Sequence, residues 1–275
     1  MRPRFPVELR LPARRRRFEF IALLTTPHID DAIEDAGGHA GELEIEVRAR
    51  AADAGRLATL LAGRAGHGLA ALPDDAQHAI AAAGRYASIT ADLPDGADLS
   101  ALRRATAIAR ALAEADDLVA WLDVATARWW LPAELSALAP ERPFDLDEHV
   151  QVVVESVERR PGHGHVVRSR GLPKLARPDV CARAPRREAE LVSEVVRDVA
   201  RLLAEGAEAV PGERLAVRGL PPVALMPRSD GALDQAPAAS APLVEICDAQ
   251  PDGIAPGCPA LLAALKPRPR LKVVR

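Results

Sequence analysis

The chain has 275 residues, a net charge of −3 at neutral pH and 48% apolar residues. This length and apolar content allow one large or two small hydrophobic cores, so global disorder is excluded. Aromatic residues make up only 3% of the chain, which leaves little surface for stacking nucleobases, and the small net charge excludes long-range steering of nucleic acid or an anionic membrane.

Cysteine usage and hydropathy indicate the compartment. Cys181, Cys247 and Cys258 are too few and too scattered for a disulfide framework or a Cys-x-x-Cys metal site, which fits a reducing environment. No apolar run reaches the roughly 18 to 20 residues that cross a bilayer. The run Arg15-Arg16-Arg17-Phe18 is similar to the start of a twin-arginine signal, but Glu19 interrupts the short apolar stretch behind it. We therefore expect a cytoplasmic protein.

The first 17 residues are predicted to form a mobile basic arm. They contain seven arginines and three prolines, a composition that neither propagates a helix nor buries apolar surface.

Residues 18–140 are predicted to form a first α+β lobe. Its clearest element is the strand at 42–50, in which small or aliphatic residues alternate strictly with charged ones. Further strands are expected at 18–24, 86–93 and 118–124, with a turn and return at 126–130, and helices at 29–36, 51–65, 74–83 and from about 98 to 112. This order predicts two βαβ units, a ferredoxin-like βαββαβ sandwich.

Residues 145–228 are predicted to form a second α+β lobe, an antiparallel meander packed on a long helix. The segment 150–157 carries apolar residues on both faces, which indicates a central strand. Short strands are expected at 165–169 and 180–183, a helix at 186–205 with a stripe of Leu191, Val195, Val199 and Leu202, and a hairpin of 215–217 with 223–226. Residues 229–275 are rich in Pro and Ala and are expected to be a tail.

Motifs that carry common chemistries are missing. The chain has no phosphate-binding loop, no Gly-x-Ser-x-Gly elbow and no His-Glu-x-x-His helix, so we predict neither catalytic residues nor a cofactor. Residues 66–71 match a relaxed dinucleotide loop, but they follow a helical pattern rather than a strand, which favours a helix-ending turn.

Three groups of polar residues allow alternative interpretations. His163 with His165, and the series Asp145, Asp147 and His149, offer metal-ligand atoms. A solvated hairpin tip and an acidic connector explain them without a metal, and nothing in the sequence makes the ligands converge. We therefore predict no metal site. His28 with the aspartates at 30 and 31 is an imidazole–carboxylate pair without a nucleophile, and it also suits the first turn of a helix.

Trp129 and Trp130 are candidates for a binding surface. Adjacent residues of a strand point to opposite faces, so both cannot lie in one core layer. An exposed tryptophan would be suited to anchor a protein interface, whereas burial in two different layers is the alternative.

The segment 167–180, Val-Arg-Ser-Arg-Gly-Leu-Pro-Lys-Leu-Ala-Arg-Pro-Asp-Val, resembles a signature of uncharacterised bacterial domain families. In that signature a strand leads into Thr-x-Gly-Leu and then a Gly-x-Pro-Asp element. Ser169 stands here at the threonine position, and Arg177 or Ala176 replaces the glycine before Pro-Asp. Together with similar stretches upstream, the resemblance covers about residues 100–205. It implies a compact bacterial α+β domain of unknown activity and carries over no catalytic residue.

Three functions remain open from the sequence. The first is a non-catalytic protein-interaction protein of the accessory or immunity type, with an unidentified protein partner. The second is an unrecognised hydrolase that uses Asp179 or the His163 and His165 pair, with its site at the Gly171–Asp179 loop. Arg170, Lys174 and Asp179 are the binding candidates there. The third is nucleic-acid binding through the basic arm, which the lack of an accompanying reader module disfavours.

Overall fold

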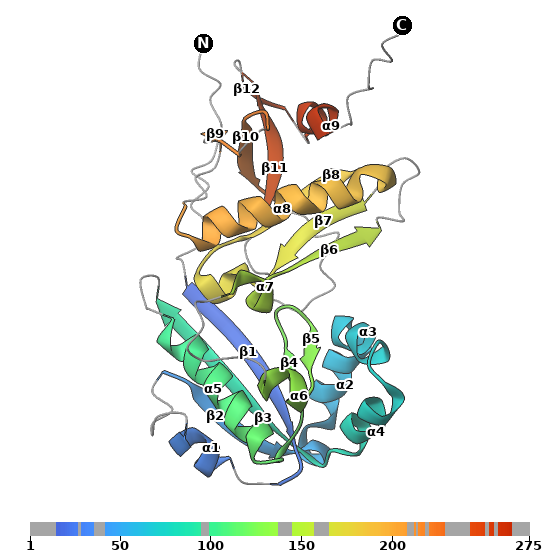
Figure 1. Ribbon diagram of the computed structural model, residues 1–275, viewed down its shortest axis with the longest axis vertical. Helices are drawn as coiled ribbons and strands as arrows, with labels where there is room; N and C mark the ends of the chain where they lie inside the picture. The colour runs from blue at the N-terminus through green and yellow to red at the C-terminus, as the bar shows by residue number, and fades with distance from the viewer. Residues whose placement is uncertain are drawn as a thin grey trace, which may run out of the picture. The chain divides into compact units, whose positions relative to one another are not determined.

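The protein is described by a computed structural model. It describes residues 15–26, 29–35, 42–94, 99–136, 145–156, 165–207, 212, 214–217, 220–228, 243–250, 253–255 and 258–265. These residues form an α+β fold with two β-sheets (Figure 1). Two compact units are distinguished by their internal contacts: the first unit contains Arg15–Asp145 and Lys174–Ala176, and the second contains Leu146–Pro173 and the described residues from Arg177 onward.

The first unit is built on a five-stranded antiparallel sheet with the strand order β2-β3-β1-β4-β5. Its strands are β1 (Arg15–Leu24), β2 (Glu44–Ala49), β3 (Arg85–Pro94), β4 (Leu118–Asp123) and β5 (Arg128–Trp130). The central strand β1 separates β3 from β4, and β3 separates β1 from β2, so each helical crossover spans one intervening antiparallel strand. The predicted βαββαβ arrangement is therefore present, with β5 added at one edge.

Two crossover helices connect these strands. They are α1 (Asp30–Asp35), between β1 and β2, and α5 (Ser100–Glu114), between β3 and β4. The two helices contact each other, as expected when crossovers of the same hand cover one face of a sheet. The predicted stripe of α5 is confirmed for Leu102, Ala105, Ile108 and Leu112, which are all buried.

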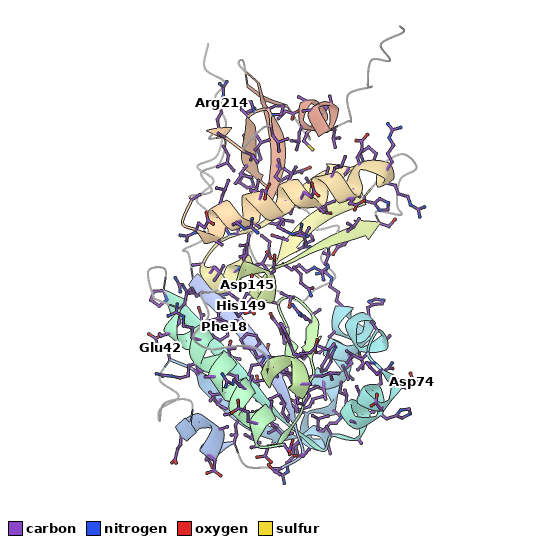
Figure 2. All side chains as sticks on the ribbon, viewed as in Figure 1. Phe18, Glu42, Asp74, Asp145, His149 and Arg214 are labelled. Carbon is purple, nitrogen blue, oxygen red and sulfur yellow. The ribbon has the colours of Figure 1, made fainter. Side chains whose placement is uncertain are left out.

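The opposite face of this sheet is covered by an insertion between β2 and β3. It comprises η1 (Arg50–Asp53), α2 (Ala54–Ala62), α3 (Arg64–Ala70) and α4 (Asp74–Ala82), whose exposed Asp74 is labelled in Figure 2. Leu57, Ala65 and Ile80 of these helices join one core cluster with Ile21 and Leu23 of β1. The single helix predicted at 51–65 is thus divided, with a break at Gly63.

The second unit contains a seven-stranded sheet with the order β6-β7-β8-β11-β10-β9, and β12 pairs with β11. Its strands are β6 (Gln151–Ser156), β7 (His165–Arg170), β8 (Asp179–Ala184), β9 (Arg214–Leu215), β10 (Val223–Pro227), β11 (Leu243–Gln250) and β12 (Gly253–Ala255). β8 and β11 are parallel, and the other pairs are antiparallel. The predicted meander and the predicted hairpin, β9 with β10, are both present.

Helices flank this second sheet. The long helix α8 (Ala189–Ala204) contacts β6, β7 and β8, and α9 (Pro259–Leu265) contacts β11. The remaining helices in the described ranges are α6 (Pro132–Ser136), α7 (Leu146–His149), η2 (Leu172–Leu175) and η3 (Arg186–Glu188). The buried side of α8 includes the predicted Val195 and Val199, but Leu191 and Leu202 are only half-buried, because Val192, Val196 and Leu203 occupy the core instead.

Three other predictions are corrected. The strand at 150–157 is not central, because β6 is the terminal strand of the sheet among the described strands. The tail predicted from residue 229 is wrong for the described residues 243–250, 253–255 and 258–265, since β11 lies inside the sheet between β8 and β10. The arm predicted for residues 1–17 lies largely outside the described residues, and its last three residues belong to β1.

Candidate functional site

The ends of β7 and β8 are joined by a buried hydrogen-bond cluster around Asp179. Its Oδ1 accepts the Ser169 hydroxyl at 3.1 Å and the backbone N–H of Leu172 at 3.2 Å. The Oγ of Ser169 also accepts the backbone N–H of Val180 at 2.8 Å. Gly171 allows the turn, since its φ of 110° lies in a region that favours glycine. The side chain of the predicted binding residue Asp179 therefore stabilises the loop between β7 and β8 by hydrogen bonds within it.

The predicted candidate Lys174 belongs to the first unit and is completely buried. Its Nζ forms an ion pair with Oδ2 of Asp123 at the end of β4, and it lies 5.8 Å from the ring centroid of Phe20. The other carboxylate oxygen of Asp123 accepts the backbone N–H groups of Ala125 and Thr126 at 3.0 and 3.4 Å. Lys174 and Asp123 are thus part of the core.

The third polar candidate, Arg170, lies at the end of β7 and forms an ion pair with Glu155 of β6. The Arg170 side chain is only 9% exposed. Each of the three predicted polar residues therefore binds a different side chain within the protein: Asp179 binds Ser169, Lys174 binds Asp123, and Arg170 binds Glu155.

More arginines lie around Glu245 on the second sheet, a grouping that the sequence did not reveal. Arg168 is paired in register with Cys181, and Cys181 with Glu245 of β11. Arg183 and Arg228 reach the Glu245 carboxylate at 3.2 and 4.0 Å. These residues lie on β7, β8 and β11 and directly after the end of β10, so only the strand register brings them together.

Both tryptophan candidates are buried, with exposed fractions of 5% for Trp129 and 8% for Trp130. The Trp129 indole N–H donates to the carbonyl oxygen of Ala65 at 2.8 Å, within the core that α2, α3 and α4 cover. Trp130 is paired in register with Trp121, and the Arg128 guanidinium lies 3.5 Å from its ring centroid. The idea of an exposed tryptophan anchor is therefore wrong, and burial in two layers is correct.

The glycines of the relaxed dinucleotide motif serve packing. Both lie within α3, so the predicted helix-ending turn is also wrong. A Cβ on Gly66 would lie 1.9 Å from the carbonyl oxygen of Leu61, and a Cβ on Gly68 would lie 2.8 Å from that of Ala127. These glycines allow backbone segments to approach each other more closely than any side chain would permit.

The described part of the chain contains no group of three or more His, Cys, Asp or Glu residues arranged to hold a metal ion. His28 and His163 lie outside the described residues. Asp30 and Asp31 lie in the first turn of α1, where carboxylates favourably meet the helix amide groups.

A polar network in the first unit was not anticipated from the sequence. The Asp53 carboxylate accepts the Tyr86 hydroxyl at 2.5 Å and the Arg48 guanidinium at 2.7 Å, and Arg48 also binds Glu46 at 2.5 Å. Beside it, Glu19 binds Arg56 and the Ser88 hydroxyl. The alternation of β2 placed Glu46 and Arg48 on one face, but only the fold brings Asp53 and Tyr86 to them.

The ionisation of this network is unsuited to proton transfer near neutral pH. The Tyr86 hydrogen bond and the Arg48 guanidinium hold the pKa of Asp53 below its usual value, whereas burial and the Asp53 carboxylate raise the pKa of Tyr86. A general acid or base works best with a pKa near the working pH. Both shifts are directed away from neutrality, so the network is better suited to holding β2, β3 and η1 together.

The three cysteines are all buried thiols in the second unit. Burial raises the pKa of Cys181 to about 11, partly opposed by a hydrogen bond from Arg228. Burial and the Asp248 carboxylate raise the pKa of Cys258 to about 12. Since the thiolate is the reactive form, neither residue has the character of a nucleophile.

We expect these thiols to react with Ellman's reagent at pH 8 only when the protein unfolds. The folded protein holds the Cys181 and Cys258 protons to a higher pH than the unfolded chain does, because both pKa values are raised above the ordinary value. The two buried thiols therefore contribute fully to the free energy of unfolding below about pH 9, and this contribution is lost as the pH rises through about 11 and 12. Between pH 8 and 10, the free energy of unfolding measured in urea should fall by about 1 kcal/mol less in Cys258→Ala than in the wild type. An identical fall in both proteins would contradict a raised pKa of Cys258.

β6 is an edge strand of the second sheet among the strands that the structure describes. β6 pairs with β7 on one side, and no described strand pairs with its other side. Val152 and Val153 are half-buried, and Val154, 48% exposed, is the most exposed large apolar side chain among the described residues.

No protein family, curated protein or solved structure matches the chain. No helix in the described ranges combines the length and apolar composition needed to cross a bilayer. The described residues thus form an α+β fold in which each predicted polar site residue binds another side chain of the chain, and Asp179 also binds the backbone.

Proposed function

We propose that this is a cytoplasmic, non-catalytic protein-interaction protein of the accessory type, and that it binds a strand of its partner along β6. The observation that supports this most is the exposed edge formed by Gln151–Ser156. An edge strand presents backbone N–H and C=O groups that can pair with another strand, and added strands are a common mode of protein recognition.

The composition of β6 supports a binding edge. Proteins usually protect an exposed edge with lysine, proline or inward-pointing charges. β6 has neither lysine nor proline, and its one charged residue, Glu155, is already bound by Arg170. The three consecutive valines give it the composition of a strand with neighbours on both sides, which is why the sequence predicted a central strand.

The contacts of two hydrolase candidates support the interaction proposal instead. Asp179 accepts two hydrogen bonds within its own loop and Lys174 is completely buried in an ion pair, which gives both side chains a structural role. Of the alternative pair His163 and His165, His163 lies outside the described residues. The proposal includes the resemblance to the uncharacterised bacterial family, which implies a compact domain without established catalytic residues. The basic arm lies mainly outside the described residues and supports no second proposal.

Site-specific photo-crosslinking in cells tests the proposal. A benzoylphenylalanine at position 154, on β6, should give a discrete protein adduct, and mass spectrometry of the adduct identifies the partner. The control carries the same group at position 49, an exposed position of the edge strand β2 in the first unit. Absence of any adduct from position 154, or equal adducts from both positions, would argue against an interaction edge at β6.

A further inference from the structure

The strand that pairs with β6 is specified by the sequence of β6 itself. We propose that it is β6 of a second copy of this chain, placed antiparallel across a two-fold axis through Val153. This inference rests on the proposed interaction function and names its partner. It would extend the sheet of the second unit across a symmetric dimer.

Strand geometry restricts the register. In an antiparallel pair, residues directly opposite each other must present their backbone groups in the same direction and their side chains on the same face. A two-fold axis must therefore pass through a residue and not between two residues. The axis through Val153 pairs Val152 with Val154 of the second copy, so each exposed Val154 gains an apolar neighbour.

The charges of the strand agree with this register. Glu155 is the single charged residue of Gln151–Ser156, and it would face itself only if the axis passed through position 155. With the axis at Val153, Glu155 lies opposite Gln151 of the second copy. A dimer in this register brings no like charges directly opposite each other.

Arg170 adds a favourable charge beside the pair of Gln151 with Glu155 of the second copy. Within one chain Gln151 is paired in register with Arg170 of β7. The row across the dimer would therefore be Arg170, Gln151 and then Glu155 of the second copy, all on one face of the extended sheet. The long guanidinium of Arg170, which already binds Glu155 of its own chain, lies two strands from the second carboxylate.

Sedimentation velocity of the full chain tests the dimer over roughly 1 to 100 µM, because an interface of one strand pair belongs to the small, weak class. Gln151→Glu places two like-charge pairs across the axis and should weaken dimerisation about 3- to 10-fold. Gln151→Lys places two opposite-charge pairs there and should strengthen it by a similar factor. Within one chain, glutamate at position 151 would attract Arg170 and lysine would repel it. An effect on monomer stability alone would therefore favour Gln151→Glu over Gln151→Lys, the opposite of the order expected for the dimer.

Val154→Lys provides a second variant at the most exposed position of the strand and should abolish the dimer, whereas Ala49→Lys on the edge strand β2 should leave it unchanged. Circular dichroism checks that both variants are folded. A chain that remains monomeric at 100 µM, or a dimer insensitive to Gln151→Glu and Val154→Lys, overturns the inference. A monomeric chain whose position 154 crosslinks to a different protein overturns only the dimer, and the proposed function stands.

Discussion

Replacing Lys174 with methionine is expected to lower the free energy of unfolding of the first unit by about 3–5 kcal/mol. The ammonium group is completely buried, and its ion-pair partner Asp123 is 1% exposed. Removing the lysine leaves a buried carboxylate with its backbone hydrogen bonds but without the opposite charge. Urea unfolding followed by tryptophan fluorescence measures the effect, since Trp121, Trp129 and Trp130 all lie in the first unit.

A double-mutant cycle separates the pair from the packing around it. Asp123→Asn keeps an oxygen for the N–H groups of Ala125 and Thr126 but removes the charge that faces Lys174. The combination with Lys174→Met should cost less than the sum of the single changes by at least about 1 kcal/mol. As a control, Arg110→Met at the exposed Arg110–Glu114 pair should cost under about 1 kcal/mol. Additive single changes, or equal costs at both pairs, would refute a coupled buried pair.

The first unit was predictable to the extent that its signals are local. The alternation of residues 42–50 and the stripe of α5 each specify one element from neighbouring residues, and their order specifies two βαβ units. The partner of Lys174 was not predictable in this way. Asp123 is 51 residues away in sequence, and nothing in the composition of either segment indicates that the two side chains meet.

The second unit was predicted less well because strand neighbours depend on distant segments. The three valines at 152–154 indicate burial on both sides, but the pattern does not say whether the second neighbour lies in the same chain. Similarly, β11 lies in a region rich in Ala and Pro, and its parallel partner β8 comes more than fifty residues earlier. The burial of both tryptophans could not be predicted for a related reason. Alternation places Trp129 and Trp130 on opposite faces of the strand, and only the inserted helices bury Trp129.

Gly66→Ala is expected to destabilise the first unit by about 3 kcal/mol or more, and Gly68→Ala by about 1–3 kcal/mol. In both variants the new Cβ meets a backbone carbonyl oxygen, which cannot rotate away as a flexible side chain would. The contact is much shorter at Gly66, 1.9 Å from the Leu61 oxygen, than at Gly68, 2.8 Å from the Ala127 oxygen. Urea unfolding followed by tryptophan fluorescence gives both values.

Gly55→Ala is the matched control for this pair, because it lies in α2 and a Cβ there meets nothing within 4 Å. Alanine is the better helix former, so this variant should gain up to about 1 kcal/mol. The expected order of cost, Gly66 above Gly68 above Gly55, follows from packing alone. If these glycines instead cradled a dinucleotide, alanine at position 66 would weaken nucleotide binding and leave the unfolding free energy nearly unchanged. That result would contradict the packing role and restore the dinucleotide loop as a candidate.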